Sequence, residues 1–229
     1  MTVAGRWPPE FPDPPRRPPI IPPAWPAPEP PPAPPAPPAR PLPTFPQVVE
    51  LPRAGDTVEE RLLERGIVLL SGQLDQPAAQ RAAAQLMLLD AEWNGPVQLH
   101  LNCPDGELDA ALVLAETVDL VHLETRAVAS GVVGGPALGV LAAADRRQGH
   151  RHALFRLREP TGRASGRADR LAADVAEHTR QVAHLHERLA SATGRPVEEV
   201  AADLRAGRVL TAEQAVDYGL LHEVVPTPR

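Results

Sequence analysis

Short apolar runs alternate with amphipathic segments along most of the chain. The run GIVLLSG at 66–72 is apolar, partly β-branched and ended by glycine, which is typical of a buried strand. The segment 75–93 indicates an amphipathic helix with Asp75 as its N-cap. Further strands are predicted at 97–102, 125–133, 152–157 and 220–225, and further helices at 107–121, 136–145, 168–191 and 196–206. This repeated order predicts an α/β fold with largely parallel strands.

Two helical segments carry additional signals. The longest, 168–191, follows the glycine-bearing loop TGRASG and has a charged face opposite one apolar stripe. That stripe is formed by Leu171, Val175, Val182, Leu185 and Leu189. Near the end of the chain, Thr211 and Gln214 have the spacing of a capping box, which marks the start of another helix.

Composition separates the first fifth of the chain from the rest. Residues 1–46 hold 21 of the 30 prolines, and proline fixes φ and removes a backbone donor. This segment is therefore predicted to be a disordered, extended tail with polyproline II character and no core of its own. It is either a stiff spacer or a docking ligand anchored by Trp7, Trp25, Arg16 and Arg17.

Charge and residue usage exclude several classes of protein. The net charge is −6 and the basic residues are dispersed, so we expect no nucleic-acid partner. All 23 basic residues are arginine, which excludes Schiff-base chemistry, a serine–lysine dyad and a phosphate-loop lysine. Cys103 is the single cysteine and cannot form an intramolecular disulfide. With no long apolar run and no signal peptide, the sequence predicts a cytoplasmic protein without a membrane contact.

Three separated segments resemble one known family. They read RLLERGIVLLSGQLD, QLMLLDAEWNGPVQLHLNCPDGELDAAL and VLTAEQAVDYGLLHEVV. In order and spacing they resemble the proteolytic subunit of the ATP-dependent Clp protease, peptidase family S14, over about Val48 to Val225. The domain organisation that follows is a tail at 1–46 and a Clp protease-like domain at 47–229.

The resemblance implies a crotonase-like fold, a spiral of strand–helix units with a protruding handle helix at about 161–191. It also implies heptameric rings that pair through this handle and enclose catalytic serines, with an ATP-driven unfoldase docked at the ends. The partners it suggests are the chain itself or an active proteolytic paralogue, and such an unfoldase. No cofactor is expected.

The positions that match the family's catalytic triad do not hold a triad. Gly135 stands where the family has its serine, Arg158 where it has histidine, and Gly207 where it has aspartate. Glycine has no side chain that could attack, and arginine stays protonated and cannot act as a general base. Gly207 also has a structural explanation, because a glycine after a helix at 196–206 favours a left-handed C-cap.

The positions that match the oxyanion hole are altered as well. One donor in the family is the backbone N–H of the residue after the serine, which here is Pro136 and has none. The other corresponds to Gly106, which is retained, but Asp105 replaces a neighbouring glycine and brings a carboxylate close.

Other candidate active groups are weaker. Ser130 lies five residues before Gly135, so it could act as a nucleophile only in a slipped register. Cys103 follows His100 by three residues, and strand alternation points the two side chains to opposite faces. A buried, unreactive thiol is therefore expected.

A metal site is not expected. His178, His184 and His186 share the long helix with Glu177 and Glu187, and only the His184–Glu187 pair has the spacing to face each other. With no third ligand on that face, the sequence favours a solvated surface.

The function predicted from the sequence is a catalytically silent Clp-type subunit that works by assembly. Three alternatives stay open, and one of them is an active serine peptidase that uses Ser130 as its nucleophile. A crotonase-like acyl-thioester enzyme could use Glu107 or Glu159 as its carboxylate, although Pro136 removes a donor that an enolate would need. An adaptor could instead work through the tail at 1–46.

Overall fold

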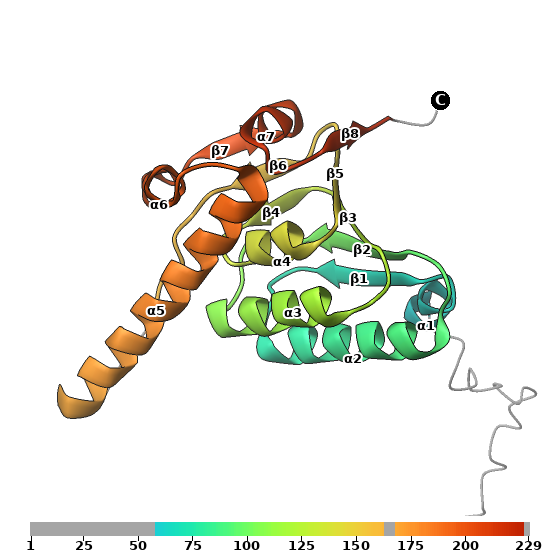
Figure 1. The fold of residues 1–229 in the computed structure, drawn as a ribbon, viewed down its shortest axis with the longest axis horizontal. Helices are drawn as coiled ribbons and strands as arrows, with labels where there is room; N and C mark the ends of the chain where they lie inside the picture. The colour runs from blue at the N-terminus through green and yellow to red at the C-terminus, as the bar shows by residue number, and fades with distance from the viewer. Residues whose placement is uncertain (1–57, 163–167, 227–229) are drawn as a thin grey trace, which may run out of the picture. The chain divides into compact units, whose positions relative to one another are not determined.

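The computed structural model describes residues 58–162 and 168–226, all of which lie within one compact unit, Glu50–Arg229. The tail predicted at 1–46 and part of the loop before the long helix lie outside the described residues. Two sheets and seven helices are present in the described part (Figure 1). The helices are α1 (Val58–Leu63), α2 (Gln76–Glu92), α3 (Leu108–Leu120), α4 (Ala137–Ala143), α5 (Ala168–Thr193), α6 (Val197–Ala206) and α7 (Ala212–Tyr218).

The larger sheet has five parallel strands in the order β1-β2-β3-β5-β8. They are β1 (Ile67–Ser71), β2 (Val97–Asn102), β3 (Thr125–Ala129), β5 (Arg146–His150) and β8 (Glu223–Val225). Helices α2, α3 and α4 lie together along one side of this sheet (Figure 1). Alternating burial along β2 fits this arrangement, because only one face of the strand meets the helices.

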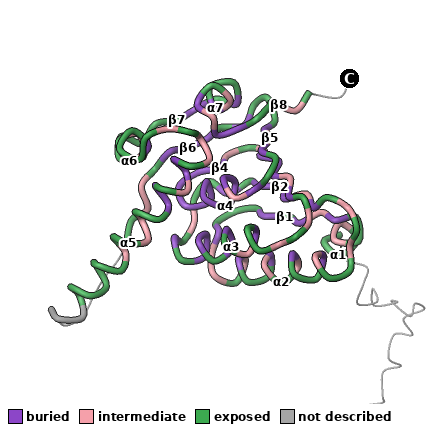
Figure 2. The backbone as a smooth tube through the Cα atoms, in the orientation of Figure 1, coloured by how far each residue is buried: buried purple, intermediate pink, exposed green. Residues whose placement is uncertain are grey.

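A smaller sheet of three strands lies beside the larger one. It contains β4 (Val132–Gly134), β6 (Leu154–Arg156) and β7 (Val209–Thr211), with β4 and β6 parallel and β6 and β7 antiparallel. The hydrophobic core is formed by buried residues of both sheets and of the helices. It includes almost all residues of α4 (Figure 2). The expected α/β spiral of strand–helix units is confirmed.

The single strand predicted at 125–133 is wrong, because the chain bends between β3 and β4 and the two strands join different sheets. Gly131 makes this bend with a φ of +59°, a conformation that favours glycine. A Cβ atom there would lie 2.5 Å from the side-chain oxygen of Asn102, which accepts a hydrogen bond from the Val132 N–H. The break in the strand could not be predicted from the residues around Gly131, because it depends on this contact with a distant part of the chain.

Strand β5 was not predicted, because its sequence RRQGH is almost entirely polar. Arg147 explains how such a strand can lie inside the fold. Its buried guanidinium donates to the backbone oxygens of Ala192, Leu220, Ala144 and Gly219 at 2.9, 3.0, 3.4 and 3.5 Å. Burial lowers the pKa of this guanidinium, and the four carbonyls compensate for part of the lost hydration.

The long helix predicted at 168–191 is present as α5, and only its second half is packed. Leu185 and Leu189 are buried, whereas 36% of Leu171 and 54% of Val175 is exposed. This half-exposed helix projects away from the sheets, as expected for a handle (Figures 1 and 2). Within the described ranges, no helix is both long and apolar enough to cross a membrane.

Candidate active site

A tight turn connects β4 to α4 and forms the centre of the candidate site. Gly135 occupies this turn with a φ of +54°, and its N–H donates to the Arg156 carbonyl at 3.0 Å. Strand, left-handed turn and buried helix are the geometry that exposes a nucleophile in hydrolases. The backbone of such a turn is therefore present, while residue 135 offers no side chain.

Arg158 lies close to this turn, two residues beyond the end of β6. A Cβ atom on Gly135 would lie 4.0 Å from the Arg158 carbonyl oxygen. On its other side, the chain around Arg158 is tied to α6 and β7: Leu157 N–H donates to Arg208 O at 2.8 Å, and Glu159 N–H donates to Leu204 O at 3.1 Å.

Gly207 is brought to the same region by these two hydrogen bonds, which flank it in sequence. It ends α6 in the left-handed conformation, with a φ of +69°, which confirms the C-cap predicted for it. No atom lies within 4 Å of a Cβ built on Gly207, so the position could hold a side chain sterically. The structure thus assembles the three positions that the resemblance assigns to a triad, and none of them carries a triad residue.

The two expected oxyanion positions differ in what they offer. Pro136 begins α4 and has no N–H. Gly106 retains its N–H, which donates to the Asp105 side chain at 2.9 Å. Neither position therefore presents a free backbone donor to a bound carbonyl group.

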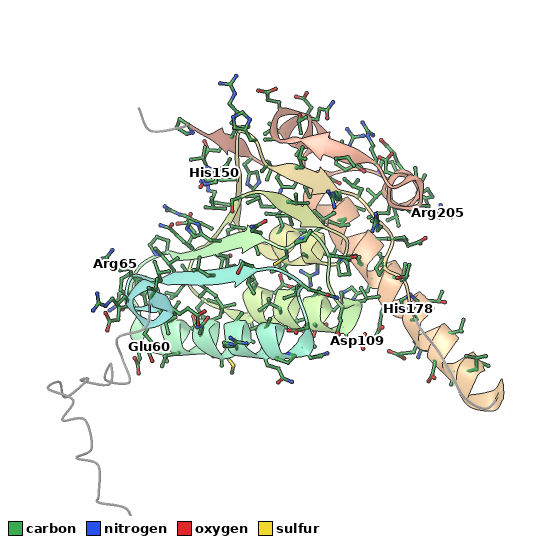
Figure 3. The ribbon with its side chains drawn as sticks, turned by 180° about the vertical axis from the view of Figure 1, so that it is seen from behind. Glu60, Arg65, Asp109, His150, His178 and Arg205 are labelled. Carbon is green, nitrogen blue, oxygen red and sulfur yellow. The ribbon has the colours of Figure 1, made fainter. Side chains whose placement is uncertain are left out.

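An open groove of about 900 Å³ runs from Asp105 and Gly106 past Arg158 to the exposed half of α5. Asp109 at the start of α3 and His178 on α5 both line it and are labelled in Figure 3. Its carboxylates are Asp105, Glu107, Asp109, Glu159, Asp174 and Glu177. The groove is therefore strongly acidic, a property that no single segment of the sequence indicates.

Cys103 and His100 do not form a dyad. Cys103 is buried, and the loss of hydration raises the pKa of its thiol to about 11. His100 lies on the other face of β2, with its Nε2 3.4 Å from the Gln98 side-chain oxygen. The prediction of an inert thiol fits this geometry.

Ser130 follows the last residue of β3, and its N–H donates to Leu101 O at 2.8 Å. Among the described residues, no side chain contacts its hydroxyl group through a hydrogen bond. The structure therefore supplies no base for Ser130 within its described part.

The solvated surface predicted for the histidines of α5 is present only in part. His184 and Glu187 are exposed, as predicted. His186 is buried, and its Nε2 lies 3.7 Å from a carboxylate oxygen of Glu159, a contact between distant segments that helical spacing could not reveal. Burial lowers the pKa of His186. In residues 58–162 and 168–226 no group of three or more His, Cys, Asp or Glu side chains could hold a metal ion.

The parallel sheet, the glycine turn before a buried helix and the long, half-exposed helix together define a crotonase-like fold. The chain belongs to the Clp protease family, whose family model matches residues 52–228. It is 33% identical over 177 residues to the ATP-dependent Clp protease proteolytic subunit 2 of Nocardia farcinica (strain IFM 10152). That alignment covers 74% of this chain and 85% of the relative.

Proposed function

We propose that this chain is a non-catalytic member of the Clp protease family that acts by assembly. The observation that carries the proposal is the turn at Gly135, which has the backbone of a nucleophile turn but no nucleophile. Arg158, beside it, cannot accept a proton. In a well-studied serine protease, loss of the triad lowers kcat by about 10⁶ and loss of one oxyanion donor by about 10² to 10³.

The partner that fits best is another proteolytic subunit, either a second copy of this chain or an active paralogue in a heptameric ring. The Nocardia farcinica relative is named as subunit 2 of an ATP-dependent protease, which supports a multi-subunit context. In such a ring this chain would cap or complete the assembly, or sequester a partner. An ATP-dependent unfoldase is the second partner that we propose. We also propose that the protein works in a reducing cytoplasm, with which the free, buried Cys103 is compatible.

The test begins with the chain alone. The purified protein is expected neither to cleave small peptide substrates nor to label with a serine-directed fluorophosphonate. An active member of the family serves as the positive control. Stoichiometric labelling mapped to Ser130 would contradict the proposal and would indicate an active site in another register.

Assembly is tested on protein purified from its own cells. Native mass spectrometry is expected to find it in oligomers with itself or with an active proteolytic subunit. A monomer under these conditions would contradict the proposal.

One alternative also has an observation in its favour, because Glu107 and Glu159 both line the acidic groove. Two carboxylates could serve an acyl-thioester enzyme of crotonase type. That reaction also needs donors for an enolate, and Pro136 has none. Turnover of an acyl thioester by the purified chain would favour this function over the non-catalytic one.

A further inference from the structure

The segment that carries Asp105 is held firmly against the Gly135 turn. Gly134 N–H donates to Cys103 O at 2.9 Å, which joins this segment to the end of β4. On the other side, Leu74 N–H donates to Asp105 O at 3.1 Å and Glu107 N–H donates to Leu74 O at 2.8 Å. The backbone of Asp105 is therefore fixed relative to both Gly106 and Gly135.

The carboxylate of Asp105 points to the place where chemistry would occur. One of its oxygens, Oδ1, accepts the Gly106 N–H at 2.9 Å. The same oxygen lies 2.8 Å from the position of a Cβ atom built on Gly135. One oxygen atom thus uses the remaining oxyanion donor and also fills the space of a side chain at residue 135.

We propose that Asp105 is a built-in occupant of this site, whose carboxylate takes the Gly106 N–H from a substrate carbonyl group and lies directly against any side chain placed at position 135. This role rests on the non-catalytic function proposed above and goes beyond it. The site would lack the side chains of a triad, and the Asp105 carboxylate would also occupy the space that remains. A negatively charged oxygen at this place would also repel the anion that forms during acyl transfer.

The reactivity of a thiol at position 135 measures the influence of the Asp105 carboxylate and does not require catalysis. In Gly135→Cys, the neighbouring carboxylate should raise the thiol pKa and so slow alkylation by iodoacetamide. Replacing the carboxylate in Gly135→Cys/Asp105→Asn should accelerate alkylation at neutral pH about tenfold. Cys103 remains silent because it is buried and its thiol pKa is about 11.

The matched control is Gly135→Cys/Asp109→Asn, which removes another carboxylate that lines the same groove. Its alkylation rate should equal that of Gly135→Cys. Equal acceleration by both asparagine substitutions would overturn the proposal, because the effect would then come from the general charge of the groove. No acceleration by Asp105→Asn would overturn it as well.

A second measurement needs no residue at position 135 and so decides the question if Gly135→Cys fails to fold. Asp105→Ala in the full chain should increase hydrogen exchange of the Gly106 amide several-fold after correction for intrinsic rates, whereas Asp109→Ala should not. Unchanged exchange in Asp105→Ala would refute the occupancy by Asp105 and leave the non-catalytic function intact. Peptide hydrolysis by the unaltered chain would instead refute the non-catalytic function.

Discussion

Gly135 is the residue at which a simple repair of the site can be tested. Gly135→Ser should remain inactive toward small peptides, because the structure offers its hydroxyl no base and Arg158 cannot act as one. Its Cβ would also meet Asp105 at 2.8 Å. Gly135→Ala has the same backbone cost without a hydroxyl and is the matched control for folding. Hydrolysis by Gly135→Ser above this control would show that a base and an oxyanion site exist elsewhere.

Adding the other groups should restore activity only in part. Arg158→His and Gly207→Asp supply a base and its orienting carboxylate, but Pro136 still withholds a donor worth about 3 kcal/mol in the transition state. Pro136→Met in the Gly135→Ser/Arg158→His/Gly207→Asp variant should therefore raise kcat/KM further. Gly207→Asp places a side chain at a φ of +69° and costs about 1 kcal/mol of stability, so unfolding is measured beside activity.

Two helix ends provide a comparison of glycines that share a left-handed backbone. Gly207 ends α6 and has open space around a Cβ, whereas a Cβ on Gly219, which ends α7, would lie 2.5 Å from Thr193 O. Gly207→Ala should lower the free energy of unfolding by about 1 kcal/mol, and Gly219→Ala by at least about 2 kcal/mol. Chemical denaturation measures both free energies of unfolding. Equal losses in the two variants would contradict the prediction that a Cβ close to Thr193 O destabilises the protein.

Arg147 connects the ends of several elements, and its neighbour Arg146 provides a control. Arg147→Met removes the donor for four backbone carbonyls at or just beyond the ends of α4, α5 and α7, and should destabilise the protein by about 3 kcal/mol. Arg146 is exposed and lies 3.8 Å from Glu124, so Arg146→Met should cost less than about 0.5 kcal/mol. Similar losses in thermal unfolding would contradict this role for Arg147.

Elements with a strong local pattern could be predicted from the sequence, and elements fixed by tertiary contacts could not. Asp75 accepts the Ala78 N–H as the predicted N-cap, and Thr211 forms the predicted capping box. Strand β5 is polar along its length and is recognisable only once the carbonyl partners of Arg147 are known. The break at Gly131 depends on Asn102, a residue 29 positions away in sequence.

Some features of the candidate site could likewise be predicted from the sequence, and others could not. The family resemblance predicts that Gly135, Arg158 and Gly207 share one site, and the structure brings these positions together through backbone contacts. The direction of the Asp105 side chain could not be predicted, because it depends on how Leu74 holds the segment that precedes α3. The acidic groove likewise forms only when α5 lies opposite the start of α3.

At the scale of the whole molecule, we expect residues 47–229 to fold and assemble when residues 1–46 are removed. Every core residue of the described part lies between Val68 and Leu221, and the match to the Clp protease family begins at residue 52. The proline-rich composition has no apolar periodicity with which to extend that core. A chain of residues 47–229 should therefore unfold within about 2 °C of the full chain and show the same oligomer in native mass spectrometry.

A chain with 1–46 replaced by a Gly/Ser segment of equal length separates the effect of length from that of sequence. If deletion abolishes assembly and the Gly/Ser segment restores it, the tail acts as a spacer that the assembly needs. If neither variant assembles, the proline-rich sequence itself makes a specific contact, and strong hydrogen-exchange protection at 1–46 in the full chain should accompany that result. Assembly of both variants, with rapid exchange at 1–46, is the outcome that composition predicts.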